Sequence, residues 1–188
     1  MENYRKPFSR LNSLSRAPII KVFLCGEGGV GKTTLIERLI RGVFNANTII
    51  TIGVQHSLYK IKTPKGKEIR LQIWDLGGEE RFKVILPIYV KGSAGGLIVF
   101  DESRYPTFRN LPEWIKLVKK SVDPDASLLL VSTKADLVDK QRISDEKMKE
   151  FLEKHGFRDY IRTSSKDGLN IEAAFKKLVQ YFEEDGKI

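Results

Sequence analysis

A glycine-rich segment between an apolar run and an amphipathic pattern constrains this chain more than any other feature. Residues 26–33 read GEGGVGKT, which matches the phosphate-loop pattern G-x-x-x-x-G-K-[ST]. The preceding run Ile19–Cys25 is apolar except for Lys21, as expected of a strand that is covered on both faces. Leucine and isoleucine recur at helical spacing in the following segment, Lys32–Arg41. A strand, a phosphate-binding loop and a helix in this order predict an α/β fold of the P-loop type.

The rest of the chain repeats this alternation of strand-like and helix-like patterns. Residues 55–75 form two predicted strands around the turn Thr63-Pro64-Lys65-Gly66, which adds an antiparallel strand at the edge of the sheet. Further strands are predicted at 95–101, 127–133 and 157–162, and further helical spacing occurs at 111–118, 148–155 and 171–182. We therefore expect a doubly wound, mostly parallel six-stranded sheet with one antiparallel edge strand and about five helices.

The length of 188 residues fits one domain, expected at 19–188, with a basic tail at 1–18. A hydrophobic fraction of 41% can build a core, so wholesale disorder is excluded. No apolar run is long enough to cross a bilayer, and the single cysteine, Cys25, excludes an internal disulfide. These features favour the reducing cytoplasm. The formal net charge of +9 leaves nucleic acid and anionic membranes open as partners.

The phosphate loop predicts a nucleotide site. Its glycines allow successive backbone N–H groups to wrap a phosphate chain, and the helix N-terminus adds positive potential. Lys32 should bridge the terminal phosphates, and the Thr33 hydroxyl should bind Mg²⁺. The residues expected to contact the nucleotide here are Glu27, Gly28, Gly29, Val30, Gly31, Lys32, Thr33 and Thr34. A glycine-rich turn without a ligand is the alternative.

Two segments downstream could complete the phosphate and metal site. Asp75 lies at the end of a predicted strand, where a carboxylate can support Mg²⁺, and Gly78 can offer its backbone N–H to the γ-phosphate. Thr51, in the predicted loop 45–52, could supply a second hydroxyl to the metal. Most loop threonines are instead solvated or cap turns.

A base-binding site is predicted after the next two strands. Asp136 can accept hydrogen bonds from the ring N–H and the exocyclic amine of guanine, a donor pair that adenine lacks. Lys134 follows Thr133 and can lay its aliphatic stem along the base, and Phe44 could cover it. Backbone N–H groups of the segment Ser164-Ser165-Lys166 could reach the guanine carbonyl.

Taken together and in order, these motifs resemble the Ras-like small GTPases. The resemblance covers about residues 19–183 and rests on GEGGVGKT, TIG at Thr51–Gly53, WDLGGE at Trp74–Glu79, TKAD at Thr133–Asp136 and SSK at Ser164–Lys166. TIG and the residues after Glu79 look Rab-like, whereas WDLGG looks Arf-like. The resemblance implies a Mg²⁺-dependent switch that hydrolyses GTP to GDP and phosphate. Its two switch segments would lie near 44–53 and 75–89.

The resemblance also assigns catalytic roles to Lys32, Gly78 and Glu79. Glu79 stands where the family usually has a catalytic glutamine that orients the attacking water. A glutamate can accept a hydrogen bond from water, but it lacks the amide donor and carries a negative charge. A module that binds GTP with little hydrolysis is therefore the alternative. Thr133 replaces the family's usual asparagine, and we expect guanine selectivity to survive this change.

The loop 44–52 holds no arginine that could stabilise the transferring phosphate from within the chain, so slow intrinsic turnover is expected. The resemblance also implies effector, exchange-factor and GTPase-activating partners. The chain shows no C-terminal prenylation cysteine and no N-myristoylation motif. The tail at 1–18 fits either a disordered segment or a short amphipathic helix in peripheral contact with an anionic membrane. A specific nucleic-acid partner is not expected, since no aromatic–basic motif of the RNA-binding folds is present.

Overall fold

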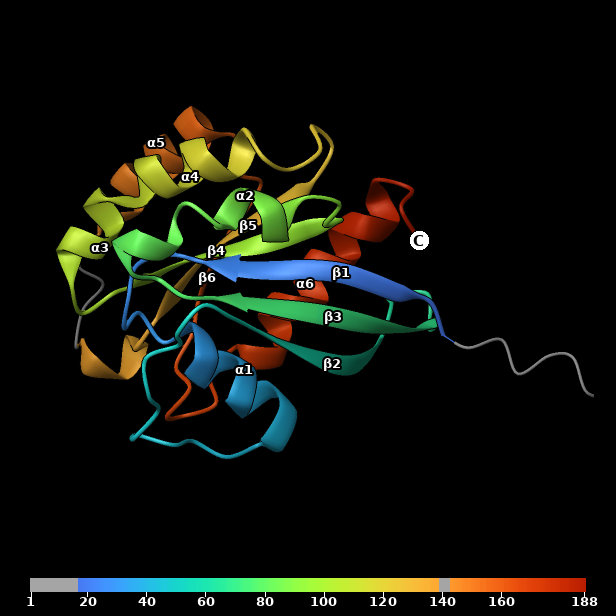
Figure 1. Cartoon of the computed structure of the whole chain (residues 1–188), viewed down its shortest axis with the longest axis horizontal. Helices are drawn as coiled ribbons and strands as arrows, with labels where there is room; N and C mark the ends of the chain where they lie inside the picture. Colours follow the sequence, from blue (N-terminus) through green and yellow to red (C-terminus); the bar gives the residue numbers. More distant parts are fainter. Residues whose placement is uncertain (1–16, 139–142) are drawn as a thin grey trace, which may run out of the picture.

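The computed structural model describes residues 17–138 and 143–188 and contains a six-stranded sheet in the order β2-β3-β1-β4-β5-β6 (Figure 1). β2 pairs antiparallel with β3, and the other neighbours are parallel. This confirms the predicted sheet, including its single antiparallel edge strand. The strands are β1 Ile19–Cys25, β2 Val54–Lys62, β3 Glu68–Leu76, β4 Gly95–Asp101, β5 Ser127–Thr133 and β6 Tyr160–Arg162.

Four of the helices are those expected from the sequence, and two short helices were not foreseen. The helices are α1 Lys32–Arg41, α2 Leu86–Val90, α3 Tyr105–Arg109, α4 Leu111–Lys119, α5 Asp145–His155 and α6 Ile171–Glu184, with 3₁₀ turns η1 at Glu80–Phe82 and η2 at Ala135–Leu137. α2 and α3 have five residues each and begin at a proline-containing turn. So short a helix does not complete two turns, and its apolar spacing therefore carries little signal.

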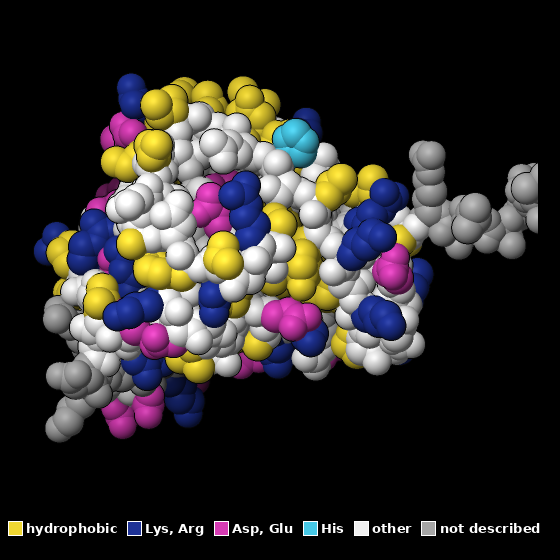
Figure 2. Space-filling model, turned by 90° about the horizontal axis from the view of Figure 1, so that it is seen from below, with side chains coloured by type: hydrophobic (Ala, Val, Ile, Leu, Met, Phe, Trp, Pro, Cys, Tyr) yellow, Lys and Arg dark blue, Asp and Glu magenta, His cyan; other side chains and the backbone are white. Residues whose placement is uncertain are grey.

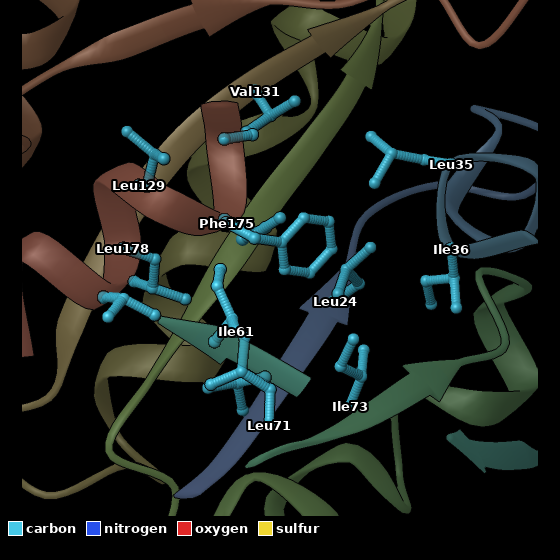
Figure 3. Packing of buried hydrophobic residues seen from close by; sticks show 14 of the residues in the cluster. Leu24, Leu35, Ile36, Ile61, Leu71, Ile73, Leu129, Val131, Phe175 and Leu178 are labelled. Atoms are coloured by element: carbon cyan, nitrogen blue, oxygen red, sulfur yellow. The ribbon is translucent and has the colours of Figure 1, made fainter. Parts of the chain in front are cut away.

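The sheet separates two hydrophobic layers, and alternate residues of β1 enter each layer. Val22 and Leu24 pack with residues of α1 and α6 on one face, where Phe175 of α6 is fully buried (Figure 3). Phe23 and Cys25 pack on the opposite face against α2, α3, α4 and α5. β1 is thus covered on both faces, which explains its nearly continuous apolar run. The burial raises the pKa of the Cys25 thiol to about 12, so this cysteine is an inert core residue.

The last strand is shorter than predicted. The sequence predicts a strand over 157–162, but only Tyr160–Arg162 pairs with β5. Phe157 is buried in the layer between α5 and the sheet and belongs to the turn after α5. Apolar character at Phe157 therefore reflects burial in a connection and not sheet pairing.

The described chain begins beside the first residues of β3. The side chain of Arg70 donates to the carbonyl of Ala17 at 3.0–3.1 Å, and its backbone N–H donates to Pro18. The tail expected at 1–18, as a short amphipathic helix or a disordered segment, lies outside the described residues except for Ala17 and Pro18. Within 17–138 and 143–188, no helix has both the length and the apolar character to cross a membrane.

We expect Phe175→Ala to lower the free energy of unfolding by about 3–5 kcal/mol, because it empties a fully buried ring site between α6 and the sheet. Urea unfolding at fixed GDP and Mg²⁺ concentrations measures this change. Leu58→Ala is the matched control, since Leu58 is 54% exposed, and it should change stability by less than about 0.5 kcal/mol. Equal losses in the two variants would contradict this description of the core.

Candidate functional site

A cavity of about 510 Å³ opens at the carboxyl ends of the parallel strands. Most of the residues predicted to bind nucleotide line it: Gly28, Gly29, Gly31, Lys32, Thr33, Thr34, Phe44, Thr51, Gly78, Thr133, Lys134, Asp136, Ser165 and Lys166. Its volume is in the range of small-molecule sites. Five elements of the chain that are far apart in sequence thus meet in one cavity.

The phosphate loop joins β1 to α1. Gly31 precedes α1 with a φ of 93°, a left-handed conformation that favours glycine. Lys32 is buried, and its Nζ donates to the carbonyls of Gly26 at 2.8 Å and Glu27 at 3.0 Å. Burial lowers the pKa of Lys32, and the carboxylate of Asp75 opposes this shift. The lysine is therefore held across the loop that a phosphate chain would occupy.

Three oxygen-bearing side chains meet beside the loop. The Thr33 hydroxyl donates to Oδ2 of Asp75 at 2.5 Å and lies 2.6 Å from the Thr51 hydroxyl. The other oxygen of Asp75, Oδ1, is buried and has no hydrogen-bond partner among the described residues. Burial raises the pKa of Asp75, and the hydrogen bond from Thr33 and the charge of Lys32 oppose this shift. Oxygen donors of this kind, one of them unsatisfied, fit a hard cation such as Mg²⁺.

Gly77 and Gly78 connect the end of β3 to the phosphate loop at close quarters. A Cβ atom at Gly78 would lie 2.4 Å from the carbonyl carbon of Glu27, and one at Gly77 would lie 2.8 Å from the carbonyl oxygen of Thr51. The Gly77 N–H also donates to the carbonyl of Gly53 at 2.8 Å. Only glycine fits at these two positions in this arrangement. The two segments after α1 and β3 are thereby joined to each other and to the loop.

The predicted base site has its polar groups in place. Asp136 lies at the cavity, and its Oδ1 accepts a hydrogen bond from the Ser164 hydroxyl at 2.7 Å. The Thr133 hydroxyl donates to the carbonyl of Val30 at 2.5 Å, with the Phe100 carbonyl at 3.1 Å. The one hydroxyl proton of Thr133 is therefore taken up by a hydrogen bond within the protein, and this bond connects β5 to the phosphate loop. Val30 and Ser164 act from behind the cavity wall through these bonds and do not line it.

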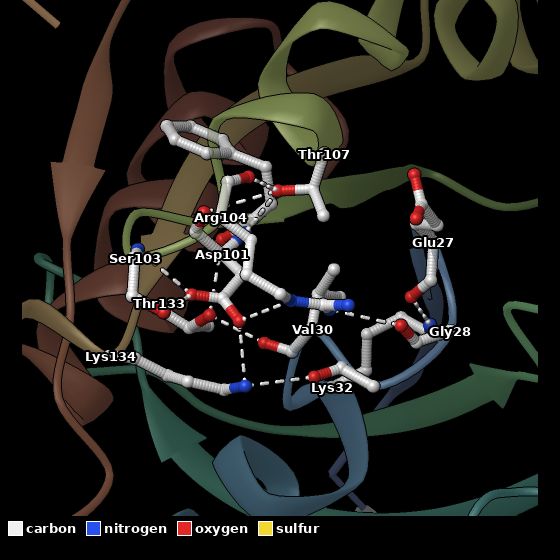
Figure 4. A network of polar contacts seen from close by, with 12 residues as sticks. Glu27, Gly28, Val30, Lys32, Asp101, Ser103, Arg104, Thr107, Thr133 and Lys134 are labelled. Carbon is white, nitrogen blue, oxygen red and sulfur yellow. Dashed lines mark hydrogen bonds and ion pairs between the residues drawn. The ribbon is translucent and has the colours of Figure 1, made fainter. Parts of the chain in front are cut away.

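A charged network that the sequence motifs do not predict lies beside the phosphate loop (Figure 4). Asp101 ends β4, is fully buried, and pairs with Arg104 at 2.9 Å and Lys134 at 2.6 Å. Arg104 also donates to the carbonyl of Gly28, and Lys134 donates to that of Gly29, each at 3.0 Å. A polar residue directly after a buried parallel strand, the pattern that singled out Asp75, also applies to Asp101.

The network shifts the titration of Asp101. Burial would raise the pKa of Asp101, but hydrogen bonds from Lys134, Ser103 and Arg104 outweigh it and hold the pKa below its usual value. Asp101 thus stays ionised and couples the backbone of the phosphate loop to Lys134.

Glu79 lies outside the main cavity. It lines a neighbouring cavity of about 440 Å³ that also borders Glu27, Gly28 and Gly78. Its carboxylate pairs with Arg81, with 3.0 Å between Oε2 and Nε. Glu27 is held in the same neighbouring cavity, where it accepts a hydrogen bond from Asn110 at 3.1 Å.

Comparison with known proteins agrees with this arrangement. A sequence model of the Ras family matches residues 21–184, which include the phosphate loop, the segments around Gly53 and Gly77, and Asp136. The chain belongs to the Ras family. It is also similar to the Ras-related protein Rab-11A of Dictyostelium discoideum, with 36% identity over 161 residues that cover 86% of this chain and 74% of that protein. This Ras-family chain is accordingly a small GTPase, a GTP hydrolase, and members of the family bind GTP or GDP with Mg²⁺.

We expect Asp101→Asn to lower the free energy of unfolding by about 1–3 kcal/mol, because it leaves two cations without their shared carboxylate. The loss is smaller than for a fully buried pair, since the Arg104 and Lys134 side chains are 44% and 34% exposed. The folded pKa of Asp101 is lowered, so this stabilisation is present above about pH 4 and is lost as the pH falls further.

Urea unfolding of both proteins between pH 3.5 and 7, at fixed GDP and Mg²⁺, measures the effect. The control is Asp123→Asn, which changes an exposed aspartate that forms no ion pair within the described residues. Similar losses from both substitutions at pH 7 would contradict a specific role for Asp101.

Proposed function

We propose that this Ras-family protein is a Mg²⁺-dependent switch that binds GTP or GDP, hydrolyses GTP to GDP and phosphate, and changes conformation near 44–53 and 75–89. The observation that carries the proposal is the meeting of Thr33, Thr51 and Asp75 within hydrogen-bonding distance. These residues come from the phosphate loop and from both proposed switch segments. A cation held by all three would link the position of both segments to the bound nucleotide.

Each part of the cavity has a proposed role in binding. Lys32 and the backbone N–H groups of the loop bind the phosphates, Thr33 and Thr51 hold Mg²⁺, and Asp75 supports it. The bound Mg²⁺ would offset the negative charge that builds up on the phosphates as the bond to the leaving group breaks. Lysine at 32 is suited to this role, because its hydrogen bonds to Gly26 and Glu27 keep the ammonium group in place before the substrate enters.

Guanine recognition is assigned to Asp136. Its Oδ1 is oriented by Ser164, so the carboxylate is held in one direction toward the cavity. The two guanine donors would bond to it, while the stem of Lys134 and the ring of Phe44 would enclose the base together with the loop at Ser165 and Lys166. Because Thr133 donates its proton to Val30, it serves the site by positioning the phosphate loop.

The switch is proposed to depend on the closeness of the two segments. Gly77 bonds to Gly53, and Gly78 packs on the backbone of the phosphate loop. The Gly78 N–H would bond to the γ-phosphate of GTP, and the Thr51 hydroxyl would hold the Mg²⁺ that accompanies it. Loss of the γ-phosphate on hydrolysis would weaken both attachments and release the two segments together.

For hydrolysis, we assign Glu79 to the attacking water. The carboxylate would accept a hydrogen bond from the water, whose oxygen forms the new bond to the γ-phosphorus as the bond to the β–γ bridging oxygen breaks. The proton of the water passes to the released phosphate, and GDP leaves. The ion pair with Arg81 offsets the negative charge that Glu79 would otherwise bring close to the γ-phosphate.

A second candidate is a GTP-binding module with little intrinsic hydrolysis. It is favoured by the position of Glu79, whose carboxylate forms an ion pair with Arg81. Glu79 lines the neighbouring cavity and not the cavity that holds Lys32 and Asp136. In both cases we expect effector, exchange-factor and GTPase-activating partners. The side-chain-free position Gly28 borders both cavities and leaves room for an arginine from an activating partner. Peripheral membrane contact through residues 1–18 also stays a prediction.

We expect Glu79→Ala to slow single-turnover GTP hydrolysis by about tenfold or more, because the water loses its acceptor. Glu79→Gln should keep a rate within about tenfold of wild type, since its amide oxygen still accepts that bond. Phosphate release from preloaded protein measures both rates. Glu80→Ala is the control, because Glu80 pairs with Lys83 and is expected to leave the rate unchanged. Unchanged rates in both Glu79 variants would exclude the role and favour the second candidate.

We expect Asp136→Asn to weaken GDP binding by about 100-fold, because the new amide places a donor against the guanine donors. The same variant should gain affinity for xanthosine diphosphate, whose carbonyl at the position of the guanine amine can accept from that amide. Competition against a fluorescent nucleotide measures both affinities. Asp167→Asn is the matched control in the adjacent loop and should bind both nucleotides as wild type does. Loss of GDP affinity without a gain for the xanthine nucleotide would contradict direct base reading by Asp136.

A further inference from the structure

The net positive charge of this protein is concentrated in two short segments. Residues 60–70 hold Lys60, Lys62, Lys65, Lys67 and Arg70 against a single acidic residue, Glu68, which leaves +4 of the total +9. Residues 1–18 hold four basic residues against one acidic residue, which leaves +3. The rest of the chain, although it makes up most of the molecule, therefore has a net charge of only +2.

Residues 60–70 lie at one end of the structure, next to the point where the described chain begins at Ala17. Residues 60–70 form the β2–β3 hairpin, and the side chain of Arg70 within it holds the carbonyl of Ala17, where the described chain begins. Figure 2 shows Lys and Arg side chains gathered at this end of the molecule. The nucleotide cavity lies at the other end, because it is built on the carboxyl ends of β1, β3 and β5 (Figure 1).

The four lysines of the hairpin are exposed and unneutralised. Within the part of the chain that the structure describes, no carboxylate lies within 4.0 Å of any of their Nζ atoms, although Glu68 stands opposite Lys62 in the register. Other lysines of the described residues, including Lys83 and Lys177, do form ion pairs on the surface of the molecule. The mutual repulsion of these four lysines is therefore not offset by a nearby carboxylate, and binding of an external anion would reduce it.

Apolar side chains accompany the lysines. Leu58 and Lys60 share one face of β2, and the register of β2, β3 and β1 places Ile19 beside Arg70 on that face. Leu58 is 54% exposed and Ile19 is 52% exposed. A surface that mixes lysines with exposed aliphatic groups suits the headgroup region of a bilayer, where the charges meet lipid phosphates and the aliphatic groups leave water.

We propose that this hairpin surface, made of Ile19, Leu58, Lys60, Lys62, Lys65, Lys67 and Arg70, docks on a membrane rich in anionic lipids. Nucleic acid is the less suitable partner, because none of these side chains is aromatic and able to stack on a base. The proposal goes beyond the GTPase switch and does not depend on hydrolysis. Docking at this end turns the cavity and both switch segments away from the bilayer, so that protein partners can reach them.

The test compares two full-length variants of equal net charge, loaded with GDP, in sedimentation with lipid vesicles. The hairpin variant is Lys60→Gln, Lys62→Gln, Lys65→Gln and Lys67→Gln. The control variant is Lys116→Gln, Lys120→Gln, Lys149→Gln and Lys154→Gln, which changes four exposed lysines of the α4–α5 region. Vesicles of phosphatidylcholine alone are compared with vesicles that contain about 30% phosphatidylserine, at an ionic strength of about 0.1 M.

We expect wild type to sediment with the phosphatidylserine vesicles and not with phosphatidylcholine alone. The hairpin variant should bind at least about tenfold more weakly, in view of the attraction of each lysine to an anionic surface, and the control variant should stay within about threefold of wild type. GDP affinity and GTP turnover in solution should be equal in all three proteins, since the changed lysines lie away from the cavity. This readout separates failure of the docking proposal from failure of the proposed function.

Three results would overturn the proposal. These are no binding of wild type to anionic vesicles, wild-type binding by the hairpin variant, and equal weakening of both variants, which would indicate a response to net charge alone. A duplex of about 20 base pairs serves as the competitor. If wild type binds this duplex more tightly than the vesicles at the same salt, and only the hairpin variant loses that binding, the surface is a nucleic-acid site instead.

Discussion

The hydrogen bond from Thr33 to Asp75 is the interaction on which the candidate site depends. It joins the first turn of α1 to the end of β3, and Thr51 lies within 2.6 Å of the same hydroxyl. Through it, the phosphate loop, the segment before β2 and the segment after β3 lie close together. Gly77 and Gly78 make this closeness sterically possible. A side chain at either position would collide with the backbone of the neighbouring segments.

A second set of bonds holds the phosphate loop from the opposite side. Carbonyls of Gly28, Gly29 and Val30 accept from Arg104, Lys134 and Thr133. Three consecutive peptide groups are thus held by side chains from the end of β5 and from the turns after β4 and β5. Asp101 keeps two of these donors in place by its charge. The carbonyls face outward to these donors, which is compatible with N–H groups turned toward the cavity. Thr133 contributes to this set through its hydroxyl alone.

The six strands, the antiparallel edge strand and the four long helices could be predicted from the sequence, because their patterns extend over many residues. Ile19–Cys25 and Gly95–Asp101 match their predicted bounds for this reason. The order of the strands in the sheet came only from the structure. α2 and α3 could not be predicted, since each has five residues and is stabilised by packing against the sheet and not by its own periodicity. Phe157 shows the converse error, in which an apolar residue that fills the core between elements was assigned to a strand.

By itself, the sequence determined which chemical groups this protein carries and in what order: a phosphate loop, oxygen donors suited to a cation and a carboxylate suited to guanine. The order of these motifs along the chain, more than any one of them, predicted a guanine-nucleotide site. Only the tertiary structure decided how these groups work together. The network of Asp101, Arg104 and Lys134, the pairing of Glu79 with Arg81, and the separation of the basic hairpin from the cavity all depend on contacts between distant residues. Residue types and spacing do not encode such contacts locally, because they arise where the packed sheet brings strand ends and turns within a few ångströms of one another.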